Sequence, residues 1–293
     1  MTLQLEKAIQ FINDVLDEDF KSEFSNGSVT LTTDDGRSIF LPVYDAKDIL
    51  QQEPTNTART KVQESAYEAW NQTGLLLIRD FLDDKTIDDL HAHATDKIAK
   101  GADKGDHFRT TEIKHGYEGR GWAQRSALRK TSPELLGKLL GASKKLQQLI
   151  FGSISTTTEI QFNATYTDDI GHIHIDRPAG FLSPTEAKFI DPSLLNSMNQ
   201  LSFQTAFYTG DTPRRKGSTG FIPGSHRLLS EAKINSINLY AEKEGQSELT
   251  KLMFHGDIPK NVAIAFQSAV LHRTGSNKSN STRLVTSKDN YYN

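Results

Sequence analysis

The chain has 293 residues, with 36% hydrophobic residues, 24% charged residues and a net charge of −3. This length allows one large domain or two ordinary ones, and the composition is typical of a globular protein. The charge gives no electrostatic reason to expect binding to nucleic acid or to an anionic membrane surface. The sequence has no apolar run long enough to span a bilayer and no cysteine, so we expect a cytoplasmic protein in which His, Asp or Glu would hold any metal.

The first half of the sequence predicts helices around one hairpin and one strand. Apolar residues recur at helical spacing from residue 1 to about residue 22, and two alternating segments flank Asp35-Gly36, a strong hairpin signal. Helical patterns follow from Thr57 to about Asn71, after Asp83 or Asp84, and from Ser132. Between the first two of these helices, the apolar run Leu75–Leu82 predicts a buried strand.

The residue pattern changes after Gly152. From there to the end, short segments of alternating apolar and polar residues are separated by turn residues. Such a series predicts a sandwich or a barrel. Helices first and strands later, without a Pro- or Ser-rich linker, indicate one α+β domain over 1–293. We divide it into an N-terminal extension (1–55), a helical support and lid region (56–150) and a β-rich core (151–293) that carries the candidate site.

Two residues in this β-rich part, His174 and Asp176, form an H-x-D pattern. Side chains two apart on a strand share one face, so both could reach one ion. His272 would complete two histidines and a carboxylate, which is the facial triad of non-haem Fe(II) oxygenases. The alternatives are a solvated polar face for the pair and a core histidine at a strand end for His272. His172 shares the face of His174, and we assign it to substrate contact, to support of the ligands, or to the strand entry.

Arg283 follows His272 by eleven residues and lies within a predicted core strand. A buried arginine is costly unless it is paired, and its planar fork binds a carboxylate through two hydrogen bonds. The carboxylate could belong to a cosubstrate on the metal. The alternative is an internal salt bridge to one of the 37 acidic residues of the chain.

Three segments together resemble the phytanoyl-CoA dioxygenase family of Fe(II)/2-oxoglutarate oxygenases. They are the H-x-D pair, KGSTGFIPGSHR (216–227) and FQSAVLHRTGSNKSNSTRLVTSKDNYY (266–292). The segment WNQTGLLLIRDFLDDKTIDDL (70–90) is similar to the opening strand and helix of the family. The resemblance covers roughly residues 60–290, and the first 55 residues lie outside it.

The resemblance implies a double-stranded β-helix, a cupin-like jelly roll, with iron at its open end. It implies that His174, Asp176 and His272 bind Fe(II), while Arg283 and Thr274 bind 2-oxoglutarate. An enzyme with Fe(II), 2-oxoglutarate and O2 bound in this way would oxidise a small organic molecule and release succinate and CO2. The molecule is expected to be a biosynthetic or secondary metabolite. Related halogenases replace the carboxylate with a small residue, so Asp176 favours hydroxylation. Desaturation, epoxidation and ring formation use the same ligands and stay open.

Two alternatives from other classes are a zinc hydrolase or isomerase on the same three residues and a jelly-roll binding module without a metal. Arg283 and Thr274 discriminate between them, since a hydrolase has no need for a 2-oxoglutarate anchor. The polar segments 107–125 and 177–199 are interpreted as lids or as ordinary surface loops. His226 is expected to be a turn residue rather than a ligand.

Overall fold

The computed structural model describes residues 2–18, 20–50, 59–104, 108–110, 120–123, 132–152, 158–165, 172–176, 202–279 and 283–291. Their elements follow in the order α1 (Leu3–Leu16), β1 (Ser28–Thr32), β2 (Ser38–Asp45), α2 (Ala46–Ile49), α3 (Lys61–Thr73), β3 (Leu75–Arg79), α4 (Asp84–Lys104), β4 (Phe108–Thr110), β5 (Arg120–Ala123), α6 (Pro133–Phe151), β6 (Thr158–Thr165), β7 (Ser202–Tyr208), β8 (Gly220–Phe221), η3 (Ser225–Arg227), α9 (Ser236–Tyr240), α10 (Lys243–Lys251), β9 (His255–Gly256), β10 (Val262–Gln267), β11 (His272–Arg273) and β12 (Arg283–Tyr291).

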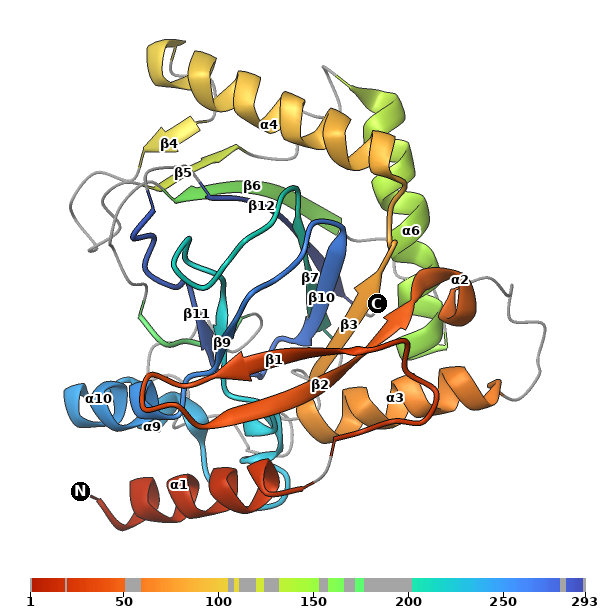
Figure 1. Ribbon diagram of the computed structural model, residues 1–293. Coiled ribbons are helices and arrows are strands. Elements are labelled where there is room, and N and C mark those ends of the chain that lie inside the picture. Colours follow the sequence, from red (N-terminus) through yellow and green to blue (C-terminus); the bar gives the residue numbers. More distant parts are fainter. Residues whose placement is uncertain are drawn as a thin grey trace.

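The strands form a large curled sheet and a small one (Figure 1). Within the described residues, the large sheet has ten strands in the order β4-β5-β6-β12-β7-β10-β3-β2-β1-β9, and β11 pairs with β8 in the small sheet. Only β2 and β3 pair in parallel among these strands. The two sheets meet at β9. Gly256 on this strand pairs with Leu31 on β1, and Phe254, the residue before β9, bridges to Phe221 on β8. The curled, mainly β architecture with flanking helices confirms the predicted jelly-roll fold class.

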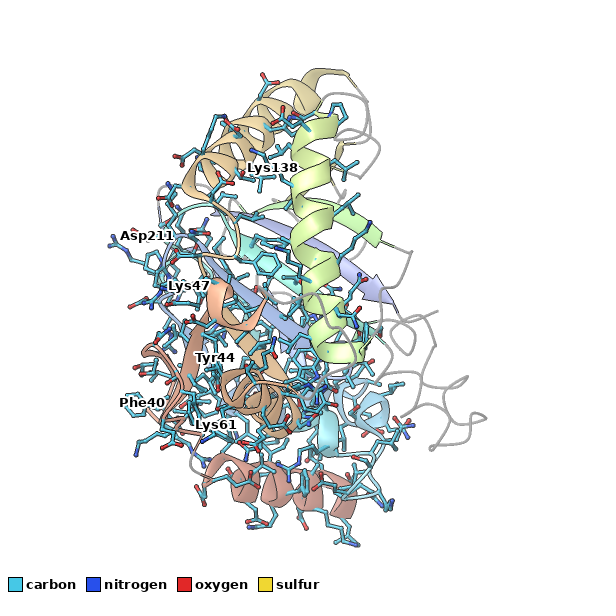
Figure 2. All side chains as sticks on the ribbon, turned by 90° about the vertical axis from the view of Figure 1, so that its right-hand side faces the viewer. Phe40, Tyr44, Lys47, Lys61, Lys138 and Asp211 are labelled. Carbon is cyan, nitrogen blue, oxygen red and sulfur yellow. The ribbon has the colours of Figure 1, made fainter. Side chains whose placement is uncertain are left out.

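The central strands of the large sheet are buried on both faces. On β10, Val262, Ile264 and Phe266 belong to a hydrophobic cluster on the inner side of the curl, which we call the inner cluster. Ala263 and Ala265 alternate with them and belong to a second cluster on the helical side of the sheet. Figure 2 looks onto that side, where α6 crosses in front of the sheet. A strand with two buried faces reads as a continuous apolar run, and that is what the sequence of β3 and β10 shows.

Several local predictions from the first half of the sequence are confirmed. The hairpin forms between β1 and β2, and Gly36 in its turn has φ 93°. Thr60 begins α3 with a capping box, and Gly74 ends it in the left-handed conformation, which glycine adopts without strain. The strand predicted for Leu75–Leu82 is shorter, since β3 ends at Arg79 and the next residue has φ 54°.

Two predictions for the second half need correction. Strands and turns were expected to dominate from Gly152 to the end, but residues 236–251 form the helices α9 and α10. The buried strand expected to run up to His272 ends at Gln267, and a turn separates β10 from the two-residue strand β11. The sequence gives no break there, because the turn residues Ser268, Ala269 and Val270 are themselves buried. The turn allows His272 to leave the large sheet and enter the small one.

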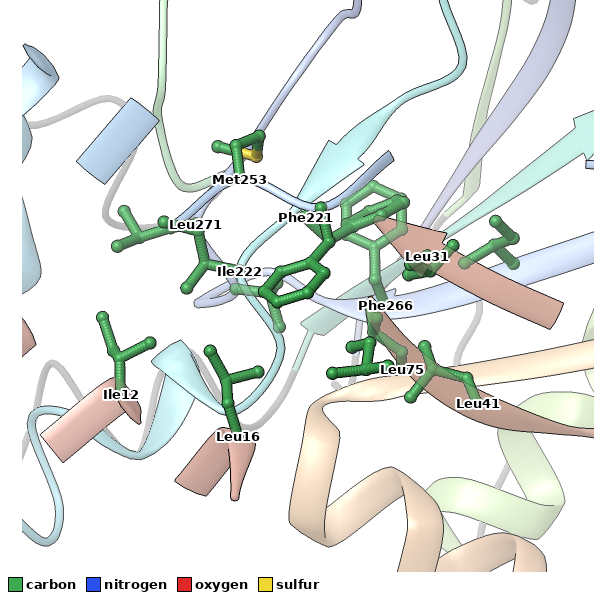
Figure 3. Close-up of a cluster of buried hydrophobic side chains, with 14 of the residues drawn as sticks. Ile12, Leu16, Leu31, Leu41, Leu75, Phe221, Ile222, Met253, Phe266 and Leu271 are labelled. Carbon is green, nitrogen blue, oxygen red and sulfur yellow. The ribbon is translucent and has the colours of Figure 1, made fainter. Parts of the chain in front are cut away.

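The N-terminal helix is part of the folded core, although it lies outside the region of family resemblance. Ile12 and Leu16 of α1 belong to the inner cluster, as do Phe221, Phe266 and Leu271 beside the candidate site (Figure 3). The division of the chain at residues 55 and 150 stays a prediction. None of the helices in the described ranges is long and apolar enough to cross a bilayer.

Replacement of Ile12 by alanine tests the contribution of α1 to stability. The Ile12 side chain is 0% exposed, so Ile12→Ala should lower the free energy of unfolding by about 2–5 kcal/mol through lost burial and a cavity. Urea unfolding at equilibrium measures the change. Leu3 in the same helix is 65% exposed, and Leu3→Ala is the matched control that should change stability little. Equal, small effects of the two variants would show that α1 does not support the core.

Candidate metal centre

The backbone places two of the predicted ligands directly opposite each other. His174 lies in the extended segment 172–176, which bridges antiparallel to β11 at His272. The His174 N–H donates to the His272 carbonyl and the His272 N–H donates to the His174 carbonyl, both at 3.0 Å. Opposed residues of an antiparallel pair project their side chains to the same face. Asp176, two residues on, shares this face, and its N–H donates to the Ser268 carbonyl at 2.8 Å.

The three side chains converge. One donor atom from each of His174, Asp176 and His272 lies within 4.8 Å of the other two, and within the described ranges no other group of three His, Asp or Glu residues does this. Nε2 of His272 is 3.2 Å from Asp176 Oδ2, and Nε2 of His174 is 3.8 Å from Asp176 Oδ1. The two imidazole rings lie 4.4 Å apart between centroids. The set therefore offers two imidazole nitrogens and one carboxylate to a common point.

Hydrogen bonds fix the tautomer of both histidines. Nδ1 of His174 lies 2.8 Å from the His172 carbonyl, and Nδ1 of His272 lies 2.9 Å from the Val270 carbonyl. Because a carbonyl oxygen only accepts, Nδ1 carries the proton in each ring. In the neutral rings the lone pair is then on Nε2, which faces the shared point. Orientation of ligand histidines by such bonds is usual in metal sites. The residues present thus fit a divalent transition metal such as Fe(II).

The electrostatics of this group favour a cation. Burial alone would lower the pKa of His272, but the charge of the Asp176 carboxylate and its hydrogen bond to the ring outweigh burial and raise that pKa above the ordinary value. A positive charge at Nε2 of His272 is therefore stabilised by Asp176. The same field would stabilise a metal ion held between the two side chains.

The centre has one closed side and one open side. The side chain of His272 is 7% exposed, that of Asp176 is 18% exposed and that of His174 is 41% exposed. Phe266 packs against the His272 ring at 4.8 Å between centroids, and Phe221 lies behind it at 6.3 Å. His174 is therefore the most accessible of the three side chains, while Phe266 and Phe221, which we call the aromatic wall, pack beside His272. The sequence did not single out these aromatic residues, because an apolar strand residue beside a metal has the same pattern as any core residue.

Tyr240 of α9 is a further neighbour that the sequence did not indicate. Burial raises the pKa of Tyr240 to about 12, and repulsion by the Asp176 carboxylate raises it further. A hydrogen bond from the Ile175 backbone acts in the opposite direction. The phenol therefore stays protonated at neutral pH. Its place in the sequence, within a segment expected to lack helices, carries no signal of this contact.

The remaining predicted residues are only partly described. His172 is exposed, and its carbonyl accepts a hydrogen bond from Nδ1 of His174. Thr274 is half-buried just after β11. Arg283 begins β12, where its backbone pairs with Thr165, but its side chain is outside the described residues. Most of the candidate lid 107–125 and all of 177–199 lie outside them as well.

His226, which the sequence excluded as a ligand, is not part of the group. Its Nε2–H donates to the Asn71 carbonyl at 3.0 Å. Burial lowers the pKa of His226 to about 4, with the Asn71 bond acting in the opposite direction. The ring is therefore a neutral structural link between the segment after β8 and α3.

Comparison with known proteins identifies the family. The sequence matches the family "Phytanoyl-CoA dioxygenase (PhyH)" over residues 70–285, more than half of the chain, so the chain belongs to this family. This confirms the resemblance seen in the sequence. Among curated proteins, none shows significant sequence similarity to the chain.

Solved structures share the fold at low sequence identity. EctD from S. alaskensis, solved with 2-oxoglutarate and 5-hydroxyectoine, has a TM-score of 0.58 at 14% identity, covering 93% of this chain and 86% of EctD. The epimerase SnoN, solved with Fe3+, alpha ketoglutarate and nogalamycin RO, has a TM-score of 0.54 at 14% identity (78% and 83% covered). The alpha ketoglutarate dependent carbocyclase SnoK from nogalamycin biosynthesis has a TM-score of 0.55 at 13% identity (82% and 87% covered). At these identities the similarity concerns the fold alone.

Proposed function

We propose that this chain is an Fe(II)/2-oxoglutarate-dependent dioxygenase that hydroxylates a small organic molecule. The observation that carries the proposal is the convergence of His174, Asp176 and His272 within 4.8 Å of one another. In this proposal the three side chains would hold the iron, and 2-oxoglutarate and O2 would bind to the same ion. Bound iron and these cosubstrates would supply the oxidant, with 2-oxoglutarate converted to succinate and CO2.

The protein residues would orient the reactants and limit the access of water. The Phe266 and Phe221 rings close the side of the centre behind His272. Substrate would then approach from the side on which His174 is exposed. Exclusion of water on one side and access on the other would direct the oxidant toward the substrate rather than toward solvent.

Arg283 is the proposed anchor of 2-oxoglutarate. Val285, two residues later on β12, pairs with Tyr208, whose side chain is buried in the inner cluster. Because opposed residues and alternate residues of a sheet share a face, the register supports a position for Arg283 on the inner side of the curl. The far carboxylate of 2-oxoglutarate would bind the guanidinium there, with the hydroxyl of Thr274 on the same group.

Hydroxylation rather than halogenation is the proposed outcome because Asp176 is present. Halogenases related to this family replace that carboxylate with a small residue, so that chloride can bind the metal. The similar solved structures include an epimerase and a carbocyclase, so the fold itself supports more than one outcome. EctD and SnoN were solved with small organic molecules, which supports a small biosynthetic metabolite as substrate.

Replacement of each proposed ligand tests the iron site. His174→Ala, Asp176→Ala and His272→Ala each remove one of three donor atoms, so each should abolish iron binding and succinate formation while circular dichroism stays native. Iron content by elemental analysis and succinate by chromatography are the measurements. His91→Ala, an exposed histidine of α4 that lies outside the group of three, is the matched control and should retain iron. Normal iron content in a ligand variant would remove that residue from the site.

Replacement of Arg283 tests the cosubstrate. Arg283→Ala should leave iron affinity nearly unchanged and weaken 2-oxoglutarate binding on the order of ten- to a hundredfold, since charge-assisted bonds contribute about 1.5–3 kcal/mol. Arg283→Lys should recover only part of the loss, because an ammonium keeps the charge but not the paired geometry. Succinate formation against 2-oxoglutarate concentration measures both variants.

Arg214, which pairs with Asp34 at the surface, provides a matched arginine control. Arg214→Ala should not change the 2-oxoglutarate dependence. A structural salt bridge of Arg283 predicts a lower melting temperature for Arg283→Ala with an unchanged 2-oxoglutarate curve, and that result would reject the cosubstrate assignment.

A further inference from the structure

The helix α10 touches both segments that carry the proposed ligands, although none of its residues belongs to the group of three. α9 and α10 are drawn below β11 and β9 in Figure 1. Gln246 of α10 hydrogen-bonds to Ile173, the residue before His174. Thr250, one turn later in the helix, hydrogen-bonds to Arg273, the residue after His272.

The contact with Ile173 takes the place of a neighbouring strand. In an extended chain, the backbone groups of successive residues point to opposite edges. His174 and Asp176 use one edge for β11 and Ser268, so the N–H and C=O of Ile173 point the other way. The Gln246 amide meets both groups: its Oε1 accepts from the Ile173 N–H at 3.1 Å and its Nε2 donates to the Ile173 carbonyl at 2.9 Å. One side chain therefore makes the two bonds that a strand residue would make.

The Gln246 side chain is itself held in place. Its second N–H donates to the Tyr240 carbonyl at 2.7 Å, so both amide hydrogens and the amide oxygen are engaged. Gly245 allows α10 to pack this closely on α9. A Cβ added at Gly245 would lie only 1.5 Å from the Leu239 carbonyl oxygen. Any other residue at this position would push the helix away and draw Gln246 off the Ile173 backbone.

The same helix also supports the segment that carries His272. The Thr250 hydroxyl donates to the Gln246 carbonyl at 2.6 Å and accepts from Arg273 Nη1 at 3.3 Å. Arg273 is 8% exposed, and a buried guanidinium needs such partners. Because Arg273 follows His272 directly, α10 restrains the two opposed ligand segments from one side.

We propose that Gln246 is a positioning residue of the metal centre, which sets the spacing of His174 and Asp176 through the Ile173 backbone. This inference rests on the metal site of the proposed function. Removal of the amide would let the segment 172–176 move at one edge, and the ligand atoms would spread. Supporting residues of metal ligands typically change metal affinity by about 10–100-fold when they are replaced.

Co(II) binding to the full-length protein tests the proposal, with Co(II) alone as the probe. Gln246→Met keeps the length of the side chain and removes its hydrogen bonds. We expect about tenfold weaker Co(II) binding and altered ligand-field absorption bands at saturating Co(II), because the coordination geometry changes. Gln10→Met removes an exposed glutamine amide of α1 and is the matched control. It should match the wild type in affinity and spectrum.

The outcomes separate the two proposals. A Gln246→Met protein with wild-type affinity and spectrum, whatever its melting temperature, overturns the positioning role. A wild-type protein that binds no Co(II) rejects the metal site itself, and the positioning role with it. Should Gln246→Met not fold, Gln246→Glu is measured instead. The glutamate retains the acceptor for the Ile173 N–H but places a carboxylate oxygen against the carbonyls of Ile173 and Tyr240. The same weaker Co(II) binding and the same spectral change are therefore expected. Their absence would overturn the positioning role.

Discussion

The reciprocal pair of hydrogen bonds between the backbones of His174 and His272 is the constraint on which the candidate centre depends. Its two bonds of 3.0 Å put the imidazoles on one face and fix their separation. A slip of one residue would turn either ring to the opposite face of the small sheet. The turn after β10 brings His272 into this register. β11 also pairs with β8. On the other side, Gln246 of α10 restrains the outer edge of the segment 172–176. The architecture around the site thus holds one short antiparallel pair in register.

The large and the small sheet have separate proposed roles. His272 lies on β11 of the small sheet, and an isolated bridge joins the segment of His174 and Asp176 to this strand. Arg283 begins a strand of the large sheet. The inner cluster packs the layers together, with Phe221 of β8 and Phe266 of β10 in contact at 5.2 Å between ring centroids. The distance between iron and the 2-oxoglutarate anchor would therefore depend on core packing rather than on a local loop. Residues of the N-terminal helix belong to the same cluster, so residues outside the family match also help to pack the two sheets together.

The sequence was sufficient for the fold class, the family and the three converging residues, because each rests on a strong pattern. The two side chains of H-x-D on an extended segment share a face through the geometry of the chain alone, and the resemblance to the family indicated His272 as the third residue. The turn after Gln267 and the helices α9 and α10 could not be predicted from it. Buried turn residues look like strand residues, and Gln246 acts on a backbone 73 positions away, a contact that no local pattern encodes. The aromatic wall of Phe266 and Phe221 was hidden for the same reason.

The central claim, that iron and 2-oxoglutarate meet at His174, Asp176 and His272, is tested most directly by an anaerobic titration of the purified protein. Fe(II) alone should give no visible band, and subsequent addition of 2-oxoglutarate should produce the weak charge-transfer band in the green that marks a keto acid chelated to Fe(II). Succinate in place of 2-oxoglutarate serves as the control, since it lacks the keto group. Stoichiometric iron binding without this band on addition of 2-oxoglutarate would contradict the account and favour a metal enzyme of another class.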